Sequence, residues 1–185
     1  MPVLRADEAP AIGVTSRLAR PDEIDTLVAI DDDASQLYAE HGIRVELGPD
    51  HPFARAERAR WLRAAELGRA FVALDEAGAA VGFAALDLID GAPYLDQLAV
   101  RRAAMRRGLG ARLLALAESW ARSVGGSSVW LTTYAHLPFN RPYYERHAYV
   151  IVPEPWWGAG IRHHVHEQRC HLPAPEQRIA MRRSI

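Results

Sequence analysis

The order of apolar and polar residues divides the first half of the chain into short predicted elements. Residues 14–19 alternate as a strand does, and Pro21 then opens a helix with acidic residues in its first turn. A second helix is predicted over 57–67, where apolar positions recur on one side. Two apolar runs at 71–74 and 81–86, separated by a glycine turn, predict a hairpin.

A strand, a basic turn and an amphipathic helix follow in the middle of the chain. Residues 94–100 form an apolar run of strand length, and residues 101–107 carry four arginines. The helix predicted over 109–124 has one apolar stripe, and Gly125-Gly126 end it. The residues of that stripe are Leu109, Leu113, Leu116, Ala117, Trp120 and Val124.

The last third of the chain holds shorter elements. Residues 128–134 predict a strand parallel to the central one, because a helix connects the two. A short helix is predicted over 137–147, and two final strands at 148–152 and 178–181. The segment between those strands, 153–177, contains many histidines and is predicted to be a long loop.

The composition fits one globular domain. The 185 residues are 49% hydrophobic and 24% charged, which are ordinary values for a protein with a sizeable core. We therefore expect a mixed α/β fold in a single domain over 1–185, with 1–13 as a loose tail. A formal net charge of −1 gives no field that favours nucleic acid or an anionic membrane. A lone cysteine, with no apolar signal segment or membrane span, predicts a cytoplasmic protein.

The turn before the long helix predicts an anion site. Gly108 and Gly110 let a ligand approach backbone N–H groups at the helix N-terminus, and Arg106 and Arg107 add positive charge. A phosphate or pyrophosphate is the expected ligand. A P-loop would need a lysine, which the chain lacks, and a dinucleotide fingerprint would need a glycine in place of Leu113. On spacing alone, a solvated basic loop that caps a core helix remains an alternative.

Two segments resemble motifs of the GCN5-related N-acetyltransferases (GNAT). Residues 106–111, which follow the strand end at 98–100, are similar to motif A, the family's phosphate loop Gln/Arg-x-x-Gly-x-Gly/Ala. Residues 140–149 resemble motif B, in which an asparagine precedes a tyrosine and a Gly-Phe pair. The chain departs from these patterns at three positions, which hold Met105 for Gln/Arg, Ala148 for Gly and Tyr149 for Phe.

The resemblance implies an acetyl-CoA-dependent N-acetyltransferase. Its fold would be a mostly antiparallel mixed sheet of about six to seven strands flanked by helices. The phosphates of CoA would lie on the turn, its pantetheine arm along the edge of the central strand and beside an asparagine. The residues implied for these contacts are Arg106, Arg107, Gly108, Leu109, Gly110 and Ala111, then Leu98, Ala99 and Val100, and Asn140.

Two side chains are implied to move protons. Asp96 would accept a proton from the acceptor, because an amine with a pKa near ~10.4 is mostly charged at neutral pH. Tyr144 aligns with the tyrosine that protonates the departing thiolate, and a phenol near pKa ~10 carries that proton at neutral pH. From the residues alone, Asp96 is equally a polar strand residue satisfied by its neighbours, and Tyr144 a core aromatic. Asn140 would also cap the short helix.

The acceptor is expected to be a primary amine of a small molecule or a peptide, and the sequence does not select one. The amine would attack directly, because Cys170 lies outside both motifs. A homodimer is left open. An alternative of another class is a non-catalytic acyl-CoA-binding sensor that keeps the phosphate turn.

A histidine cluster in the predicted loop raises the question of a metal. It matches no zinc template, so no metal is expected, and a loop that lines the acceptor pocket is the preferred interpretation. Trp156 and Trp157 would then be apolar or cation-binding surfaces, or core aromatics beneath the loop. Residues 31–33, three aspartates, are predicted to be a solvated helical turn. The cluster comprises His163, His164, His166, Cys170 and His171.

Overall fold

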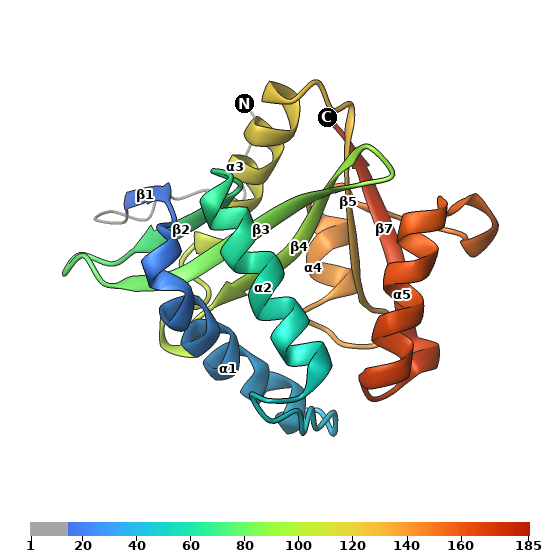
Figure 1. Cartoon of the computed structure of the whole chain (residues 1–185), viewed down its shortest axis with the longest axis horizontal. Coiled ribbons are helices and arrows are strands. Elements are labelled where there is room, and N and C mark those ends of the chain that lie inside the picture. Colours follow the sequence, from blue (N-terminus) through green and yellow to red (C-terminus); the bar gives the residue numbers. More distant parts are fainter. Residues whose placement is uncertain (1–14) are drawn as a thin grey trace, which may run out of the picture.

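One mixed sheet runs through the protein, which is seen here as a computed structural model that describes residues 15–185 (Figure 1). The tail predicted over 1–13 lies outside the described residues. Among the residues described, the sheet has seven strands in the order β1-β2-β3-β4-β5-β7-β6, and only β4 and β5 are parallel. The strands are β1 Thr15–Leu18, β2 Ala70–Leu74, β3 Ala80–Ile89, β4 Ala92–Val100, β5 Ser128–Tyr134, β6 Val150–Val152 and β7 Arg178–Ser184.

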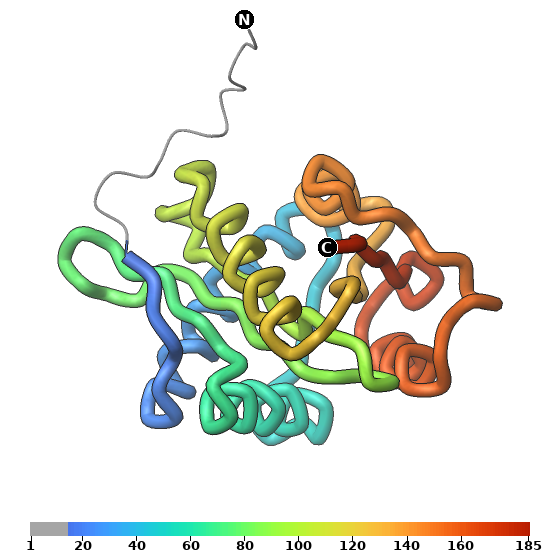
Figure 2. The backbone as a smooth tube through the Cα atoms, turned by 90° about the horizontal axis from the view of Figure 1, so that it is seen from above, coloured from blue at the N-terminus to red at the C-terminus, as the bar shows by residue number. Residues whose placement is uncertain are grey.

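Helices cover both faces of this sheet, as Figures 1 and 2 show. On one face α1, α2 and α5 pack over the sheet, and on the other face lie α3 and the short α4. The architecture and the parallel crossover between β4 and β5 confirm the predicted fold. The helices are α1 Ile24–Glu40, α2 Pro52–Glu66, α3 Leu109–Ser123, α4 Arg141–Arg146 and α5 Ala159–His171; 3₁₀ turns lie at Pro21–Glu23, Arg102–Ala104, Glu154–Trp156 and Pro175–Gln177.

The stripe of α3 forms the centre of the core on its face. Leu109, Leu113 and Ala117 are buried there against β4, β5 and β7, as the periodicity predicted. Val124 is the exception, because the helix ends one residue earlier and leaves this side chain 47% exposed. The strongest pattern in the sequence therefore placed the helix that carries the phosphate turn.

The predicted loop at 153–177 is wrong, because it contains helix α5. Ile161 and Val165 are buried against Tyr94 of β4 and Ala180 of β7. Histidine and arginine occupy the remaining positions, so the apolar residues are too few to show a helical period in the sequence.

The N-terminus of α5 is capped by a residue from a distant turn. The carboxylate of Asp90, between β3 and β4, accepts hydrogen bonds from the backbone N–H groups of Gly160 at 2.8 and 3.0 Å and of Ile161 at 3.2 Å. A methyl group at Gly160 would lie 2.8 Å from Asp90 Oδ1, so the absence of a side chain makes room for the cap. A cap this far along the chain leaves no local signal in the sequence.

Two other helices differ from their predicted bounds. The short helix is Arg141–Arg146 rather than 137–147. Helix α2 starts at Pro52 and not at residue 57, because proline is favourable at the first helical position and His51 Nδ1 accepts a hydrogen bond from the N–H of Phe53 at 3.2 Å.

Candidate active site

The sheet opens between β4 and β5. The two strands pair only at Tyr94 with Trp130 and at Leu95 with Leu131. Farther along β4, residues 98–100 pair with β3 on one side, and no strand residue is paired with them on the other. Backbone groups on that edge are therefore free to bind an extended ligand, as the prediction for Leu98, Ala99 and Val100 requires.

A β-bulge in β4 directs two consecutive side chains to the same face. The register with β3 shifts between Ala85 and Leu86, so Asp96 is the extra residue on β4. Asp96 contacts α2, and the next residue, Gln97, donates a hydrogen bond to Asp31 of α1. Neighbours on a regular strand would point to opposite faces. The bulge thus presents two polar groups beside the opening.

The turn predicted to bind phosphate, residues 106–111, contains two residues in the left-handed region. Arg106 and Gly108 both have positive φ, at 62° and 76°, and α3 begins directly afterwards at Leu109. Within residues 15–185, no side chain caps the N-terminus of α3, so the N–H groups of its first turn are left for a ligand. Arg106 and Arg107 are exposed beside them. The structure therefore brings the predicted anion-binding groups together.

Gly110 has a second reason to be small. A Cβ atom at this position would lie 2.5 Å from the hydroxyl of Tyr143 in α4. The glycine that sequence reasoning assigned to ligand approach therefore also lets α4 pack against α3.

Asp96 is a buried carboxylate held by α2. Its side chain is 5% exposed, and Arg60 Nε donates to both of its oxygens at 3.2 Å. Trp61 Nε1 donates to Oδ2 at 3.1 Å, and His164 Nε2 lies 3.8 Å from Oδ1. Burial raises the pKa of Asp96, and the charge and hydrogen bonds of Arg60 oppose that shift. The predicted proton acceptor is therefore beside the opening, within an ion pair.

Two further acids share this face, and sequence reasoning missed both. Burial raises the pKa of Asp31 to about 7, against the hydrogen bond from Gln97, and raises the pKa of Glu57 to about 8, with the charge of Asp31 adding to the shift. Asp31 belongs to the aspartate turn that was predicted to be solvated, and that prediction holds only for Asp32, which is exposed. Both acids lie inside amphipathic helices, where nothing in the sequence separates them from surface acids.

Tyr144 comes from the opposite face of the sheet. It packs in the α3 core, with its ring centroid 5.3 Å from that of Tyr143 and 5.7 Å from that of Tyr149. Burial raises the pKa of Tyr144 well above its ordinary value, so the phenol keeps its proton. It is a core aromatic, and its role as an acid stays a prediction.

Asn140 does not cap α4, which corrects the structural part of its predicted role. No side chain bonds to the first turn of that helix. The Asn140 amide instead donates a hydrogen bond to the hydroxyl of Tyr38 in α1 at 3.2 Å. Asn140 therefore ties α4 to the helix on the other side of the opening.

A crevice of about 360 Å³ separates α2 from α5 and leads toward Asp96. Arg60 and His164 line it, and both lie next to that carboxylate. Burial lowers the pKa of His164 to about 3, so its ring is neutral. The remaining lining residues are Pro52, Phe53, Ala56, His163, Glu167 and His171. The histidine-rich segment thus forms one wall of this crevice, as a helix rather than the predicted loop, and its role at the acceptor stays a prediction.

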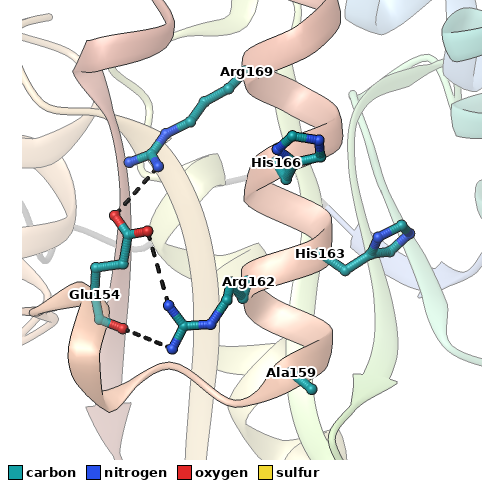
Figure 3. Close-up of a pocket in the computed structure, with 6 residues that line it drawn as sticks. All are labelled: Glu154, Ala159, Arg162, His163, His166 and Arg169. Atoms are coloured by element: carbon teal, nitrogen blue, oxygen red, sulfur yellow. Dashed lines mark hydrogen bonds and ion pairs between the residues drawn. The ribbon is translucent and has the colours of Figure 1, made fainter.

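A second hollow of about 520 Å³ lies along α5 (Figure 3). Arg162 and Arg169 both reach the carboxylate of Glu154, at 3.9 and 3.3 Å, while His163 extends in another direction. None of the residues that line this hollow contacts Asp96. It is a surface feature held by ion pairs, apart from the opening in the sheet.

The two tryptophans and the histidine cluster have separate outcomes. Trp157 is a core residue whose Nε1 donates to the carbonyl of Val152 at 2.7 Å, whereas Trp156 is 77% exposed. Within residues 15–185, no three His, Cys, Asp or Glu side chains are grouped to hold a metal ion. His166 and Cys170 are neighbours, with Nε2 3.6 Å from Sγ.

Within residues 15–185, no helix combines the length and the hydropathy that crossing a bilayer requires.

A family model described as the acetyltransferase (GNAT) family matches residues 28–149, more than half of the 185 residues. The chain belongs to this family. The match includes the phosphate turn, β4 and the segment 140–149, so it confirms the resemblance drawn from those motifs. The chain is accordingly an acetyltransferase by family.

Solved structures support the same fold. The chain is similar to a PaiA N-acetyltransferase from Thermoplasma acidophilum in complex with coenzyme A, with 13% identity, 94% and 100% of the two chains covered and a TM-score of 0.68. It also resembles Rv2747 from Mycobacterium tuberculosis in complex with CoA and NLQ, at 16% identity, 92% and 99% coverage and a TM-score of 0.65. Ard1 from Thermoplasma volcanium is similar too, with 16% identity, 94% and 99% of the two chains covered and a TM-score of 0.63.

Proposed function

We propose that this acetyltransferase transfers the acetyl group of acetyl-CoA to a primary amine by direct attack. The observation that carries the proposal is the opening between β4 and β5. A phosphate-binding turn lies beyond one end of β4, acids border one face of the opening, and a protonated tyrosine comes from the other face. Similar proteins crystallised with coenzyme A support the choice of co-substrate.

The residues of the turn and of β4 fit CoA. The free N–H groups at Gly108, Leu109, Gly110 and Ala111 and the charges of Arg106 and Arg107 would hold phosphates. The open edge at 98–100 would pair with the amides of the pantetheine arm, and Asn140, which directly precedes α4, would contact that arm. The thioester supplies an activated acetyl group when bound. Binding, orientation and proton transfer would come from the chain's own backbone groups and side chains.

Asp96 is the proposed proton acceptor for the amine. The Arg60 ion pair favours its charged form, and its place on the bulge directs it to the face that α2 and α5 border. Glu57 and Asp31 lie near it and have pKa values close to neutrality, as a general base needs. They are the acids to test next, ahead of Asp32 and Glu40 of α1, because both of those side chains are exposed.

Tyr144 is the proposed acid for the thiolate. A phenol that keeps its proton can donate it to a thiolate whose parent thiol has a pKa near ~8.5. Cys170 is exposed on α5, so no cysteine beside the opening offers a covalent route within the described residues.

Thiol release from acetyl-CoA over a panel of primary amines tests the proposal. The panel includes polyamines, amino acids, aromatic amines and short peptides. We expect release with one of these classes and a rate that rises with pH as amine and base lose protons. Tight CoA binding with no release on any amine would instead support the sensor alternative, for which the Arg60–Asp96 ion pair is a structural argument.

A further inference from the structure

Arg178, at the start of β7, is a buried guanidinium with no carboxylate partner. The residue is 7% exposed, and its Cζ lies 4.6 Å from the ring centroid of Tyr134. Its Nε donates to Gln168 Oε1 at 3.2 Å and its Nη2 to Thr132 Oγ1 at 3.4 Å. Within residues 15–185, no Asp or Glu forms an ion pair with it.

Two other buried charges among residues 15–185 are paired. Asp96 has Arg60, and Glu118, which is 6% exposed, has Arg183. A charge withdrawn from water without a counter-ion is unfavourable. Arg178 therefore differs from Asp96 and Glu118, because no residue of opposite charge forms an ion pair with it.

The Arg178 guanidinium is partly open. Among residues 15–185 it donates to Gln168 and Thr132 and is within hydrogen-bonding reach of the Tyr134 hydroxyl, and none of these partners is a carboxylate. Three of its five N–H groups are therefore used, and two are left for a ligand such as a carboxylate.

This guanidinium lies among the residues of the acceptor side. Gln168 joins Arg178 to His164 of the crevice, with 3.2 Å between Gln168 Nε2 and His164 Nε2, and His164 lies next to Asp96. Since Gln168 Oε1 accepts from Arg178, its Nε2 must donate, and His164 Nε2 accepts. Arg178 is also close enough for its charge to act on Glu57 of α2 and Tyr94 of β4.

We propose that Arg178 binds a carboxylate of the acceptor, so the preferred acceptors are amines that also carry a carboxylate, of which amino acids are the simplest class. The inference rests on the proposed amine acetylation. Each charge of such a zwitterion finds its complement: the carboxylate meets Arg178, and the ammonium meets the acids that receive its proton. Arg60 does not offer the same site, because Asp96 already occupies its guanidinium.

Matched acceptor pairs test the proposal in the wild-type protein. The twenty standard L-amino acids are compared with their carboxamides, with rates referred to the unprotonated amine because an amide lowers the amine pKa. We expect kcat/KM to favour the free acid of the best pair by about 10–100-fold, as a hydrogen-bonded charge pair provides. Equal values for every pair would overturn the proposal.

Substitution of Arg178 then locates the preference. Arg178→Gln should abolish it, mainly through a higher KM for the free acids, and Arg178→Lys should restore part of it. Arg182→Gln, on the same strand but exposed over Trp130, is the matched control and should change nothing. A preference that survives in Arg178→Gln would contradict the assignment. If that variant does not fold, the wild-type pairs decide alone.

A binding measurement separates this inference from the proposed function. Calorimetry of the same L-amino acids and carboxamides with the CoA-saturated protein requires no turnover. Binding that prefers the acids, without thiol release on any amine, would support Arg178 and contradict catalysis. Thiol release on amines with equal binding of acids and amides would support catalysis and overturn the role of Arg178.

Discussion

The two sides of the opening between β4 and β5 are built in different ways. The cofactor side comes from one continuous stretch, residues 98–111, and acts mainly through backbone groups and exposed arginines. The acceptor side collects polar and charged side chains, buried or half-buried, from α1, α2, β4, α5 and β7. A site made of backbone groups depends on local conformation rather than on particular side chains, which suits a ligand that does not vary, such as CoA. Scattered side chains can change one at a time, so we propose that acceptor specificity resides on this side.

The largest expected effect tests whether the acceptor side contains the base. In Asp96→Asn the side chain keeps its size but loses its basicity, and kcat/KM at neutral pH should fall by roughly 10²–10⁴-fold. Part of the activity should return at high pH, where more amine is already neutral. The measurement is a pH series of kcat/KM for wild type and variant, with thermal melts to detect loss of the Arg60 ion pair.

Glu57→Gln is the matched comparison for Asp96→Asn. Superimposable pH profiles for Asp96→Asn and wild type, together with a large loss in Glu57→Gln, would move the role of base to Glu57. Raised carboxyl pKa values also make the native state bind more protons than the unfolded state. Glu57 therefore lowers stability as pH rises from about 4.5 to about 8, and Glu57→Gln should remove that slope.

Tyr144→Phe tests the proposed proton donor, which lies in α4 on the face of the sheet that α3 covers. We expect kcat to fall by roughly 10²-fold while CoA affinity stays the same, because the hydroxyl matters mainly in the transition state. Tyr143→Phe, at the adjacent ring, is the control. Wild-type turnover in Tyr144→Phe would remove this residue from the mechanism.

A negative charge in the phosphate turn should lower the affinity for CoA without affecting the acceptor side. Gly108→Asp places a carboxylate where phosphates are proposed to bind, and calorimetry should show CoA affinity lowered by about 10–100-fold. Gly108→Asn has a side chain of similar size and the same need for positive φ, so it isolates the charge. Equal affinities for wild type and both folded variants would place the phosphate site elsewhere. We avoid Gly110 here, because its substitution would disturb Tyr143.

The buried imidazole of the acceptor side should make the protein sensitive to acid. His164 has a pKa near 3 in the folded state and about 6.5 when unfolded, so the unfolded state binds more protons between these values. Stability should therefore fall as pH drops below 6.5, by roughly 2 kcal/mol at pH 5 from this group. Urea unfolding at pH 7 and pH 5 measures it. His164→Gln should lose this contribution, whereas the exposed His163→Gln should keep it.

The smallest effect concerns how the acceptor side is held in place. Asp90→Ala removes the cap of α5 and should lower stability by about 1 kcal/mol, as loss of an N-cap does. Asp90→Asn keeps an accepting oxygen and should lose less. Because α5 forms one wall of the crevice, KM for the acceptor should rise while CoA affinity does not change. A change confined to CoA affinity would contradict the division between the two sides.

The sequence by itself determined the sheet's strands, the helix α3 and the phosphate turn. Each depends on interactions between near neighbours: alternation along a strand, an apolar stripe on a helix, and glycine where φ is positive. Leu109, Gly108 and the strand 128–134 lie where those patterns placed them. The two motifs also indicated the GNAT family, because their residue types and their order along the chain are specific to it when both occur.

Only the tertiary structure decided the acceptor side. Helix α5 is stabilised by Asp90, seventy positions away, and by packing on Tyr94, so its own residues show no helical pattern. The side chains of Asp96 and Gln97 point to the same face because of a one-residue bulge, and Asp31 is half-buried because Gln97 of β4 lies beside it. The missing partner of Arg178 is a property of its surroundings. Burial and charge pairing are relations between distant segments, and the order of residues along the chain does not contain them until the chain folds.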